Sequence, residues 1–390
     1  MPGPDVDFVL AALRRDAGAV HAQREAAARV DDWAAVARFA AAHDVSWWVA
    51  RALPAEGVPS GVLAALVDAV RETALHALAA ARQLAELSRV LGDAGVRAVA
   101  YKGPALSIDV HADLAARNFD DLDILVGESD RDRARGALAA AGYASPTGHS
   151  EREEKFYSRW EGVAHFARDG ALPVELHWRC QAPRYGGPQD PADIVARARP
   201  CALGGGAVFV PSPEDLGVLL ALHGVKHAWR YLQWVADFSA AVSRPAFDWT
   251  RFVSLADSWG VRRATHCAVL VAHDLVALEV PAALLRLARD DARAEFLARG
   301  VVARLTLARV APEIGAESTA RYDLQWLDGA WAKARYLALA AALPTPQERQ
   351  VAKLPDALLP LAYPLRAWRR CPHARGRRAC PARCVPSSPR

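Results

Sequence analysis

The sequence lacks an uninterrupted apolar run of about 20 residues, the length that an α-helix needs to cross a bilayer. Its most apolar segments, residues 267–280 and 336–343, are shorter than this. The amino-terminal segment carries acids where a secretory signal peptide carries positive charge. The cysteines of the body, Cys180, Cys201 and Cys267, lack the regular spacing of a disulfide framework. These absences favour a globular protein with reduced thiols, and we expect it in the cytoplasm.

The body of the chain also lacks a surplus of basic residues. The formal net charge of +4 arises from 48 Lys and Arg against 44 Asp and Glu, but eight of the Arg lie in residues 366–390, which hold no acid. The rest of the chain therefore has 40 basic and 44 acidic residues. Binding of duplex nucleic acid through its phosphates needs a broad basic surface. Extended nucleic acid is therefore not an expected partner, whereas a local basic site for a triphosphate is compatible with this balance.

The chain divides into successive parts whose patterns differ. Residues 1–93 have helical periodicity and include a long amphipathic helix predicted at 62–91. Residues 94–211 contain strand-like runs, and residues 212–365 are helical again, beginning with a Ser-Pro-Glu-Asp helix start. Residues 366–390, rich in Arg, Pro and Cys, are predicted to be a disordered basic tail. We find no internal repeat, and 390 residues with 52% hydrophobic content suffice for two or three packed units.

The strand-like runs of the central part predict a small sheet. The β-branched run at 96–101 is bounded by Gly95 and Gly103, and the strand-like run at 121–126 precedes Gly127. The runs at 163–167 and 172–178 flank an Arg-Asp-Gly segment, which is a hairpin signal because a tight turn needs residues that tolerate positive φ. A hairpin makes its two strands antiparallel, so the sheet cannot be purely parallel. The predicted fold class is α+β, with a small mixed β-sheet core flanked by N- and C-terminal helical regions.

Acidic residues stand at unusual places on these strands. Asp121 and Asp123 are two apart, so on a strand both project from the same face. Neighbouring carboxylates repel each other unless water or a cation neutralises them, and Mg²⁺ prefers oxygen ligands. An isolated Asp-x-Asp is common in surface loops. Glu175, however, adds a third acid on a strand whose alternate positions look buried, and three such carboxylates suit a two-metal site for displacement at phosphorus, where the third could also accept the proton of the attacking hydroxyl.

Several motifs follow one another in a fixed order along the chain. They are Lys102-Gly103, Arg117 followed by Asp121 and Asp123, Glu175-Leu176-His177-Trp178, the helix start Pro213–Leu216, and the His-Gly-x-x-His segment His223–His227. Their order resembles that of a known family, the uncharacterised bacterial nucleotidyltransferases, and the resemblance covers roughly residues 30–370.

The resemblance implies a nucleotidyltransferase core like that of DNA polymerase β. Such a core would move an NMP from an NTP, with ATP as the expected donor, to a hydroxyl or phosphate of an acceptor and release pyrophosphate. Asp121 and Asp123 would hold two Mg²⁺ ions, with Glu175 as the third carboxylate. The wider superfamily has a Gly-Ser phosphate loop where this sequence has Lys102-Gly103. Gly103 would allow a phosphate to approach the backbone, and Lys102 would supply charge.

Further residues are candidates for binding the nucleotide. Arg117 could clamp a phosphate, or it could be a surface residue that neutralises Asp120 and Asp121. His177 could contact substrate or form a hydrogen bond within the sheet. The pair His223 and His227 could bind zinc, be buried structural histidines, or lie on a helix facing the nucleotide, with Lys226 or His227 touching the triphosphate. In the tail, a zinc site is conceivable although its spacing fits no common motif; its ligands would be Cys371, His373, Cys380 and Cys384.

Alternatives to this function remain open from the sequence. The acceptor could be a small molecule, a modified peptide, a protein side chain or an RNA end. A toxin-type enzyme that nucleotidylates tRNA or protein would show the same motifs. A degenerate fold kept as a binding or scaffold module is a non-enzymatic alternative. The sequence does not indicate the oligomeric state.

Overall fold

The computed structural model describes residues 3–146, 150–188, 190–307, 316–344 and 354–365. The predicted disordered tail, with the candidate zinc ligands Cys371, His373, Cys380 and Cys384, lies outside these residues. Among the helices of the described ranges, none combines the length and the apolar character needed to cross a bilayer.

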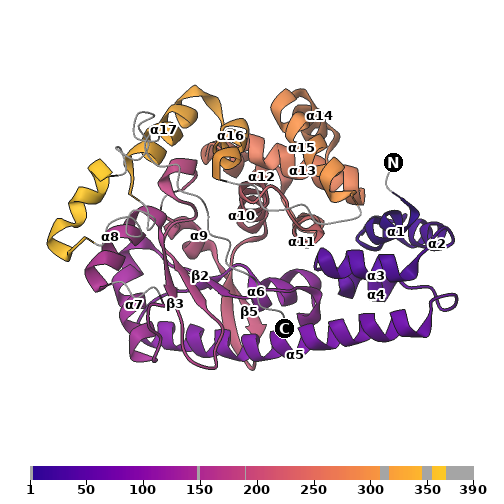
Figure 1. Cartoon of the computed structure of the whole chain (residues 1–390), viewed down its shortest axis with the longest axis horizontal. Helices are drawn as coiled ribbons and strands as arrows, with labels where there is room; N and C mark the ends of the chain where they lie inside the picture. The colour runs from indigo at the N-terminus through magenta and orange to yellow at the C-terminus, as the bar shows by residue number, and fades with distance from the viewer. Residues whose placement is uncertain (1–2, 147–149, 189, 308–315, 345–353, 366–390) are drawn as a thin grey trace, which may run out of the picture.

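The amino-terminal part is helical, as its periodicity predicts. Its helices are α1 (Pro4–Ala12), α2 (Ala19–Ala27), α3 (Trp33–Ala42), α4 (Ser46–Ala52) and α5 (Ser60–Asp93). The long helix predicted at 62–91 is confirmed as α5, which runs along the lower edge of the molecule in Figure 1. The second half of α5 buries a stripe that includes Ala80, Leu84 and Leu87, and this stripe packs on the sheet.

A mixed sheet of six strands, counted over the described residues, lies on α5. Its strands are β1 (Val99–Ala100), β2 (Leu122–Leu125), β3 (Val163–Phe166), β4 (Val174–His177), β5 (Arg199–Leu203) and β6 (Gly206–Val210). Their order across the sheet is β3-β4-β2-β1-β6-β5. β2 is parallel to β4 and β1 is parallel to β6, whereas the other neighbours are antiparallel. The predicted α+β class is confirmed.

Helical segments connect the strands. They are α6 (Gly103–Leu106), the π-helix η1 (Ser107–His111), the 3₁₀ helices η2 (Leu114–Ala116), η3 (Glu128–Asp130) and η4 (Pro183–Tyr185), and the helices α7 (Arg131–Ala140), α8 (Glu151–Glu161) and α9 (Ala192–Arg197).

The carboxy-terminal part is again helical and follows the predicted start, where the Ser212 side chain caps the first helix. Its elements are α10 (Pro213–Lys226), α11 (Leu232–Val242), α12 (Trp249–Ser258), α13 (Arg262–Val276), α14 (Ala282–Asp290), α15 (Ala292–Leu305), α16 (Ala316–Trp326), α17 (Gly329–Ala342) and the 3₁₀ helix η5 (Asp356–Leu361). Phe8 and Val36 share one apolar core with Phe238 and Leu270. The two helical regions are therefore packed together, although the sheet separates them in sequence.

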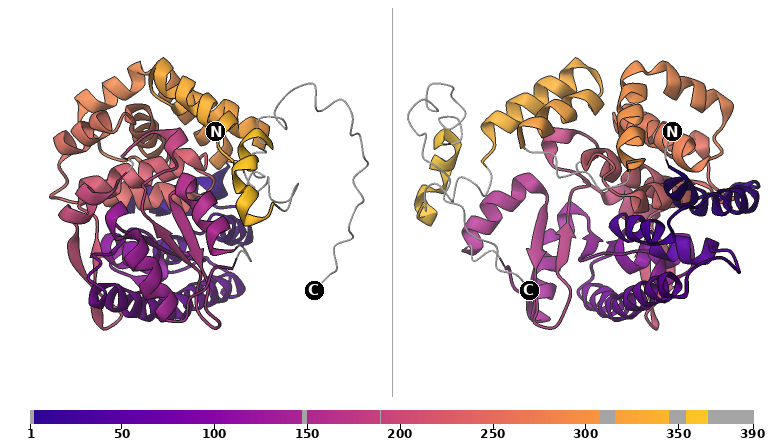
Figure 2. Two further views of the ribbon diagram at one scale, coloured as in Figure 1. Left: turned by 90° about the vertical axis from the view of Figure 1, so that its left-hand side faces the viewer. Right: turned by 45° about the vertical axis from the view of Figure 1, so that its right-hand side comes forward.

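The two faces of the sheet meet different neighbours. Leu122 and Ile124 point toward α5 and α7, in the apolar cluster that holds Leu84. Leu125 points the other way and packs against Leu219 of α10. Side chains alternate along a strand, so odd-numbered residues of β2 face α10. Figures 1 and 2 show α16 and α17 extending from the α13–α15 layer across the top of the molecule toward α8.

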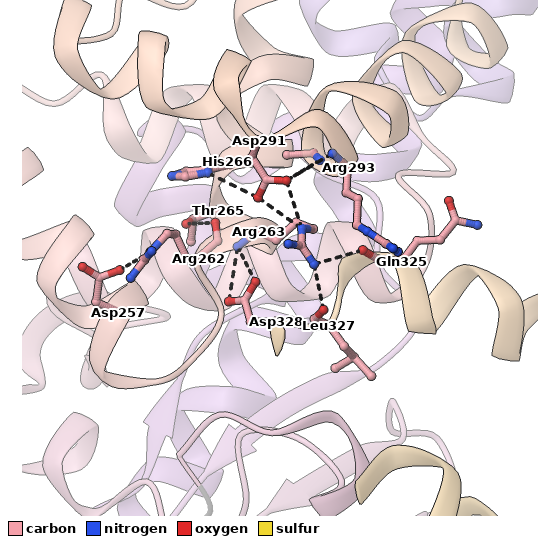
Figure 3. Close-up of polar contacts among 11 residues, drawn as sticks. Asp257, Arg262, Arg263, Thr265, His266, Asp291, Arg293, Gln325, Leu327 and Asp328 are labelled. Atoms are coloured by element: carbon pink, nitrogen blue, oxygen red, sulfur yellow. Dashed lines mark hydrogen bonds and ion pairs between the residues drawn. The ribbon is translucent and has the colours of Figure 1, made fainter. Parts of the chain in front are cut away.

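An arginine on α13 joins three parts of the carboxy-terminal region, as Figure 3 shows. The Arg263 Nε lies 3.1 Å from Asp291 Oδ1, and Asp291 also caps the start of α15. The Arg263 Nη1 donates to the backbone oxygen of Leu327 at 2.8 Å, just after α16. The backbone N–H of Arg263 donates to Asp328 at 3.2 Å. This side chain therefore fixes the link between α16 and α17 relative to α13.

Candidate active site

Asp123 and Glu175 lie opposite each other on the parallel strands β2 and β4. Leu125 and His177 form a later pair of the same register. Residues paired in this way project from the same face of a sheet. Asp123, Glu175 and His177 therefore share the face that looks toward α10, and Glu175 is not on the far side of the sheet from Asp123.

Asp123 is at the centre of a network of polar contacts. Its side chain is only 1% exposed, and its Oδ1 lies 2.9 Å from the Lys102 Nζ. The same oxygen lies 3.0 Å from the His177 Nε2, and it accepts a longer bond of 3.4 Å from the Tyr101 hydroxyl. Burial alone would raise the pKa of the Asp123 carboxyl, but the Lys102 ammonium and the bond from His177 outweigh it and hold this pKa far below its ordinary value. Asp123 is thus a buried carboxylate.

Glu175 is held between two imidazoles. Its Oε2 lies 3.2 Å from the His177 Nε2, and its Oε1 lies 3.2 Å from the Nδ1 of His165, the residue opposite it on β3. Burial opposes ionisation, yet the bonds from His165 and His177 lower the pKa of Glu175 well below its ordinary range. The Glu175 carboxylate is therefore ionised, and each of its oxygens is oriented by a histidine.

Asp121 precedes β2 and faces the same cavity. Burial and the nearby charge of Asp123 raise its pKa to about 6, although Lys102 opposes the shift. Within the described residues, Asp123, Glu175 and His177 form a group whose potential ligand atoms all lie within 4.8 Å of one another. Asp121 lies beside this group and is not part of it.

Asp121, Glu175 and His177 line a cavity of about 390 Å³ between the sheet and α10, which we call the site cavity. Asp123 contacts Lys102 and His177 of this lining but is not itself one of the lining residues. Sheet residues and their loops form one wall, and α10 forms the other. The lining residues are Tyr101, Lys102, Asp121, Glu161, Val163, His165, Glu175, His177, Arg179, Cys180, Gln181, Ala182, Leu219, Leu222, His223, Lys226 and His227. A ligand in this space would touch acids on one side and basic groups on both.

The α10 wall presents the His-Gly-x-x-His segment. The rings of His223 and His227 are 4.8 Å apart and pack on Trp234. Burial, followed by the charge of Lys226, lowers the pKa of His227 to about 4, and burial also lowers the pKa of His223. Both rings are therefore neutral near pH 7. The three-ligand group found in the described chain does not include them, so the geometry gives no support to a zinc site here.

Gly224 in this segment has a packing role. A Cβ at Gly224 would lie 2.4 Å from the indole of Trp229, which is closer than any side chain can approach. Trp229 is fully buried in the core that joins the two helical regions. The glycine thus lets α10 pass close to Trp229, and this close packing fixes the wall that carries Lys226.

Lys102 and Gly103 lie at the turn between β1 and α6. Gly103 has φ +58, a conformation that favours glycine, and a Cβ there would contact the backbone oxygen of Asp121 at 3.5 Å. The Lys102–Gly103 turn therefore lies against the acidic residues Asp121 and Asp123.

Arg117 is not among the residues that line the site cavity. It is 5% exposed, so the alternative of a surface residue that neutralises Asp120 and Asp121 does not describe it. Its Nε lies 2.7 Å from Asp237 of α11, and its Nη1 donates to the Gly103 backbone oxygen at 3.4 Å. Arg117 is close to the aspartates in sequence, but its guanidinium points toward α11. Through its bond to Gly103 it supports the Lys102–Gly103 turn.

Comparison with protein families shows the family to which the chain belongs. A family described as uncharacterised nucleotidyltransferase matches residues 30–277, which make up more than half of the chain. The chain belongs to this family. The matched region of this nucleotidyltransferase runs from before α3 to the end of α13, so it includes the sheet, the site cavity and α10. Comparisons with curated proteins and with solved structures give no significant match.

Some residues of the nucleotidyltransferase site were not predicted from the sequence. Tyr101, Glu161, His165 and Gln181 all line the cavity. His165 lies in the predicted hairpin, but its pairing with Glu175 depends on the length of the turn, which the sequence alone does not fix. The others have no local signal, because they reach the cavity from a strand end, a helix end and a loop that only the tertiary structure brings together.

Proposed function

We propose that this nucleotidyltransferase moves an NMP from an NTP, with ATP as the donor, to a hydroxyl or phosphate of an acceptor in an Mg²⁺-dependent reaction that releases pyrophosphate. The observation that supports this most strongly is the pairing of Asp123 with Glu175 on one buried face of the sheet, with Asp121 beside them at the same cavity. The acceptor in this proposal is a small molecule, a peptide or a protein side chain.

The donor atoms at this place fit hard divalent ions. Asp121 and Glu175 line the site cavity, and the buried Asp123 lies opposite Glu175 on the neighbouring strand. Carboxylate oxygens are the preferred protein ligands of Mg²⁺, which otherwise takes substrate phosphates. Asp121, Asp123 and Glu175 would hold the ions, whose charge would stabilise the negative charge that develops when phosphorus is attacked. The strand register holds Asp123 and Glu175 side by side, and the ions would take the place of basic groups that now contact their oxygens.

Basic groups on both walls suit a triphosphate. Lys102 comes from the β1–α6 turn, and Lys226 and His227 come from α10. Positioned lysines and backbone N–H groups bind phosphate oxygens strongly when they are partly shielded from water. We assign the triphosphate to the space between Lys102 with Gly103 and Lys226 with His227, and we place His177 next to it beside the acids.

The experiment that tests this function is incubation of the full chain with each labelled NTP, Mg²⁺ and host extract, followed by mass identification of the product that gains an NMP. Asp121→Asn and Asp123→Asn should abolish turnover while far-ultraviolet circular dichroism stays unchanged. Asp120→Asn is the matched control, because Asp120 is adjacent in sequence and exposed, and this variant should keep its activity. Turnover that persists in a pure Asp121→Asn/Asp123→Asn double variant would overturn the proposal.

A further inference from the structure

The His177 imidazole occupies an unusual position between two carboxylates. Its Nε2 lies 3.0 Å from Asp123 Oδ1 and 3.2 Å from Glu175 Oε2. An octahedral ion with bonds of about 2.1–2.2 Å has adjacent ligand atoms roughly 3 Å apart. The two distances therefore match the spacing of neighbouring ligands around one small divalent ion.

The fold holds this imidazole in place. Residues 175 and 177 share a face because they are two apart on β4, and the pairing of β4 with β2 brings Asp123 opposite Glu175 on that same face. The ring of Tyr101 packs edge-on against His177, with centroids 5.8 Å apart and an interplanar angle of 77°. The His177 side chain is 16% exposed and lines the site cavity. The ligand set is thus arranged by the sheet itself, without a flexible loop.

We propose that His177 is a direct ligand, through Nε2, of one of the divalent ions, so that Asp123, Glu175 and His177 form a mixed nitrogen and oxygen site that prefers Mn²⁺ over Mg²⁺. This inference rests on the proposed function, because it places an ion at the same acids. Mg²⁺ is bound almost entirely by oxygen, whereas an imidazole ligand favours the transition metals, and carboxylates together with one imidazole suit Mn²⁺. On binding, the ion replaces the N–H that the two oxygens share, and the proton leaves to solvent.

His165 and Lys102 also contact the two carboxylates, and these contacts suggest an alternative to metal binding. The His165 Nδ1 lies 3.2 Å from the other Glu175 oxygen, but its side chain is 49% exposed and it is not part of the three-ligand group. The Lys102 Nζ shares Asp123 Oδ1 with His177. The competing interpretation is a purely electrostatic cluster, in which a protonated His177 and Lys102 neutralise the acids and the imidazole never bonds to a metal.

Electron paramagnetic resonance of the full chain with Mn²⁺, in the absence of nucleotide, separates these interpretations. Electron spin-echo modulation detects nitrogen bonded to Mn²⁺, and the loss of the free-ion signal gives the affinity. The wild type and His165→Gln should show ¹⁴N modulation from one imidazole. His177→Gln should lose this modulation and bind Mn²⁺ at least tenfold more weakly. In competition, Mn²⁺ should bind at least tenfold more tightly than Mg²⁺ to the wild type, and this preference should fall toward parity in His177→Gln.

A second measurement needs no substitution. Protein grown with ¹⁵N-labelled histidine should replace the ¹⁴N modulation by the ¹⁵N doublet, even if His177→Gln fails to fold. Absence of nitrogen coupling in the wild type, or its persistence in a folded His177→Gln protein, would overturn the proposal. A protein that transfers nucleotides but shows no nitrogen coupling refutes the ligand assignment alone. A protein that shows the coupling but transfers no nucleotide refutes the proposed function alone.

Discussion

His43, at the junction between the amino-terminal helices and the segment that leads to the aspartates, should make the stability of the protein depend on pH. Its side chain is buried, 1% exposed, and within the described chain neither ring nitrogen has a hydrogen-bond partner. Its backbone oxygen accepts from the N–H of Gln233, whose side chain in turn bonds both backbone groups of Asn118. Burial, followed by the charge of Arg304, lowers the pKa of His43 from 6.5 to about 4.

The magnitude follows from linkage between protonation and folding. Above pH 6.5 the imidazole is neutral in both the folded and the unfolded chain, so the free energy of unfolding is unaffected. As the pH falls toward 4, His43 becomes protonated in the unfolded chain but stays neutral in the folded chain. The free energy of unfolding therefore decreases. A pKa difference of about 2.5 units corresponds to roughly 3 kcal/mol, at 1.36 kcal/mol per unit.

The test compares the wild type with His43→Phe, which retains the ring contact with Phe39 but has no titratable nitrogen. Urea unfolding between pH 7.5 and pH 4 should show the wild type losing about 3 kcal/mol more than the variant. All other groups titrate in both proteins, so their contributions cancel in the difference. Parallel curves for the two proteins would show that His43 is protonated in the folded state and would refute the reasoning.

Three further substitutions test the packing and charge described above. Asp237→Asn leaves the buried Arg117 guanidinium without its anionic partner and should lower the free energy of unfolding by about 3–5 kcal/mol, measured by urea denaturation. Gly204→Ala places a Cβ 2.4 Å from the backbone of α5 at φ +62 and should cost roughly 2–5 kcal/mol in the same assay, whereas Gly205→Ala, with open space around it, should cost about 1–2 kcal/mol. Lys226→Met should raise KM for the NTP at least tenfold, since a bond to a charged phosphate contributes about 1.5–3 kcal/mol, and should change kcat less.

Each of these has a control or an opposing outcome. For the buried pair, Asp32→Asn removes one charge of the exposed Arg38–Asp32 pair and should lower the free energy of unfolding much less than Asp237→Asn does. Equal losses in Gly204→Ala and Gly205→Ala would mean that the β5–β6 turn does not pack on α5. An unchanged KM in Lys226→Met would remove α10 from the triphosphate site.

Much of the site follows from residue spacing alone. Because side chains alternate along a strand, the sequence alone predicts that Asp123 lies on the opposite face from Leu122. It likewise predicts that Glu175 and His177 lie on the opposite face from Leu176. Their meeting on one face of one sheet needed the parallel pairing of β2 with β4, which no local pattern encodes.

The register of the β3–β4 hairpin could not be predicted from the sequence either. A two-residue turn at Asp169-Gly170 would set His165 opposite Val174, but the structure pairs it with Glu175. A shift of one residue moves every side chain to the other face, so the contact between His165 and Glu175 depends on a turn length that packing decides.

Two elements were not predicted although their signals are local. Gly204 and Gly205 separate β5 from β6, a glycine pair typical of a hairpin turn. Ser150 and Glu153 form a reciprocal capping box at the start of α8. Arg117 is a different case, because its sequence position beside the aspartates gives no indication of Asp237, which lies 120 residues farther along the chain.

The stacking of Tyr185 on Trp326 bears on how this protein should be produced. Tyr185 of η4 follows the cavity residues Gln181 and Ala182, and its ring lies 5.6 Å from that of Trp326 on α16. The Asp323 carboxylate then accepts from the Tyr336 hydroxyl at 2.7 Å. The family match ends at residue 277, so an expression boundary drawn there would remove the aromatic support from beneath one cavity wall. Recombinant work on this enzyme should therefore keep the chain through α17, even where sequence similarity has ended.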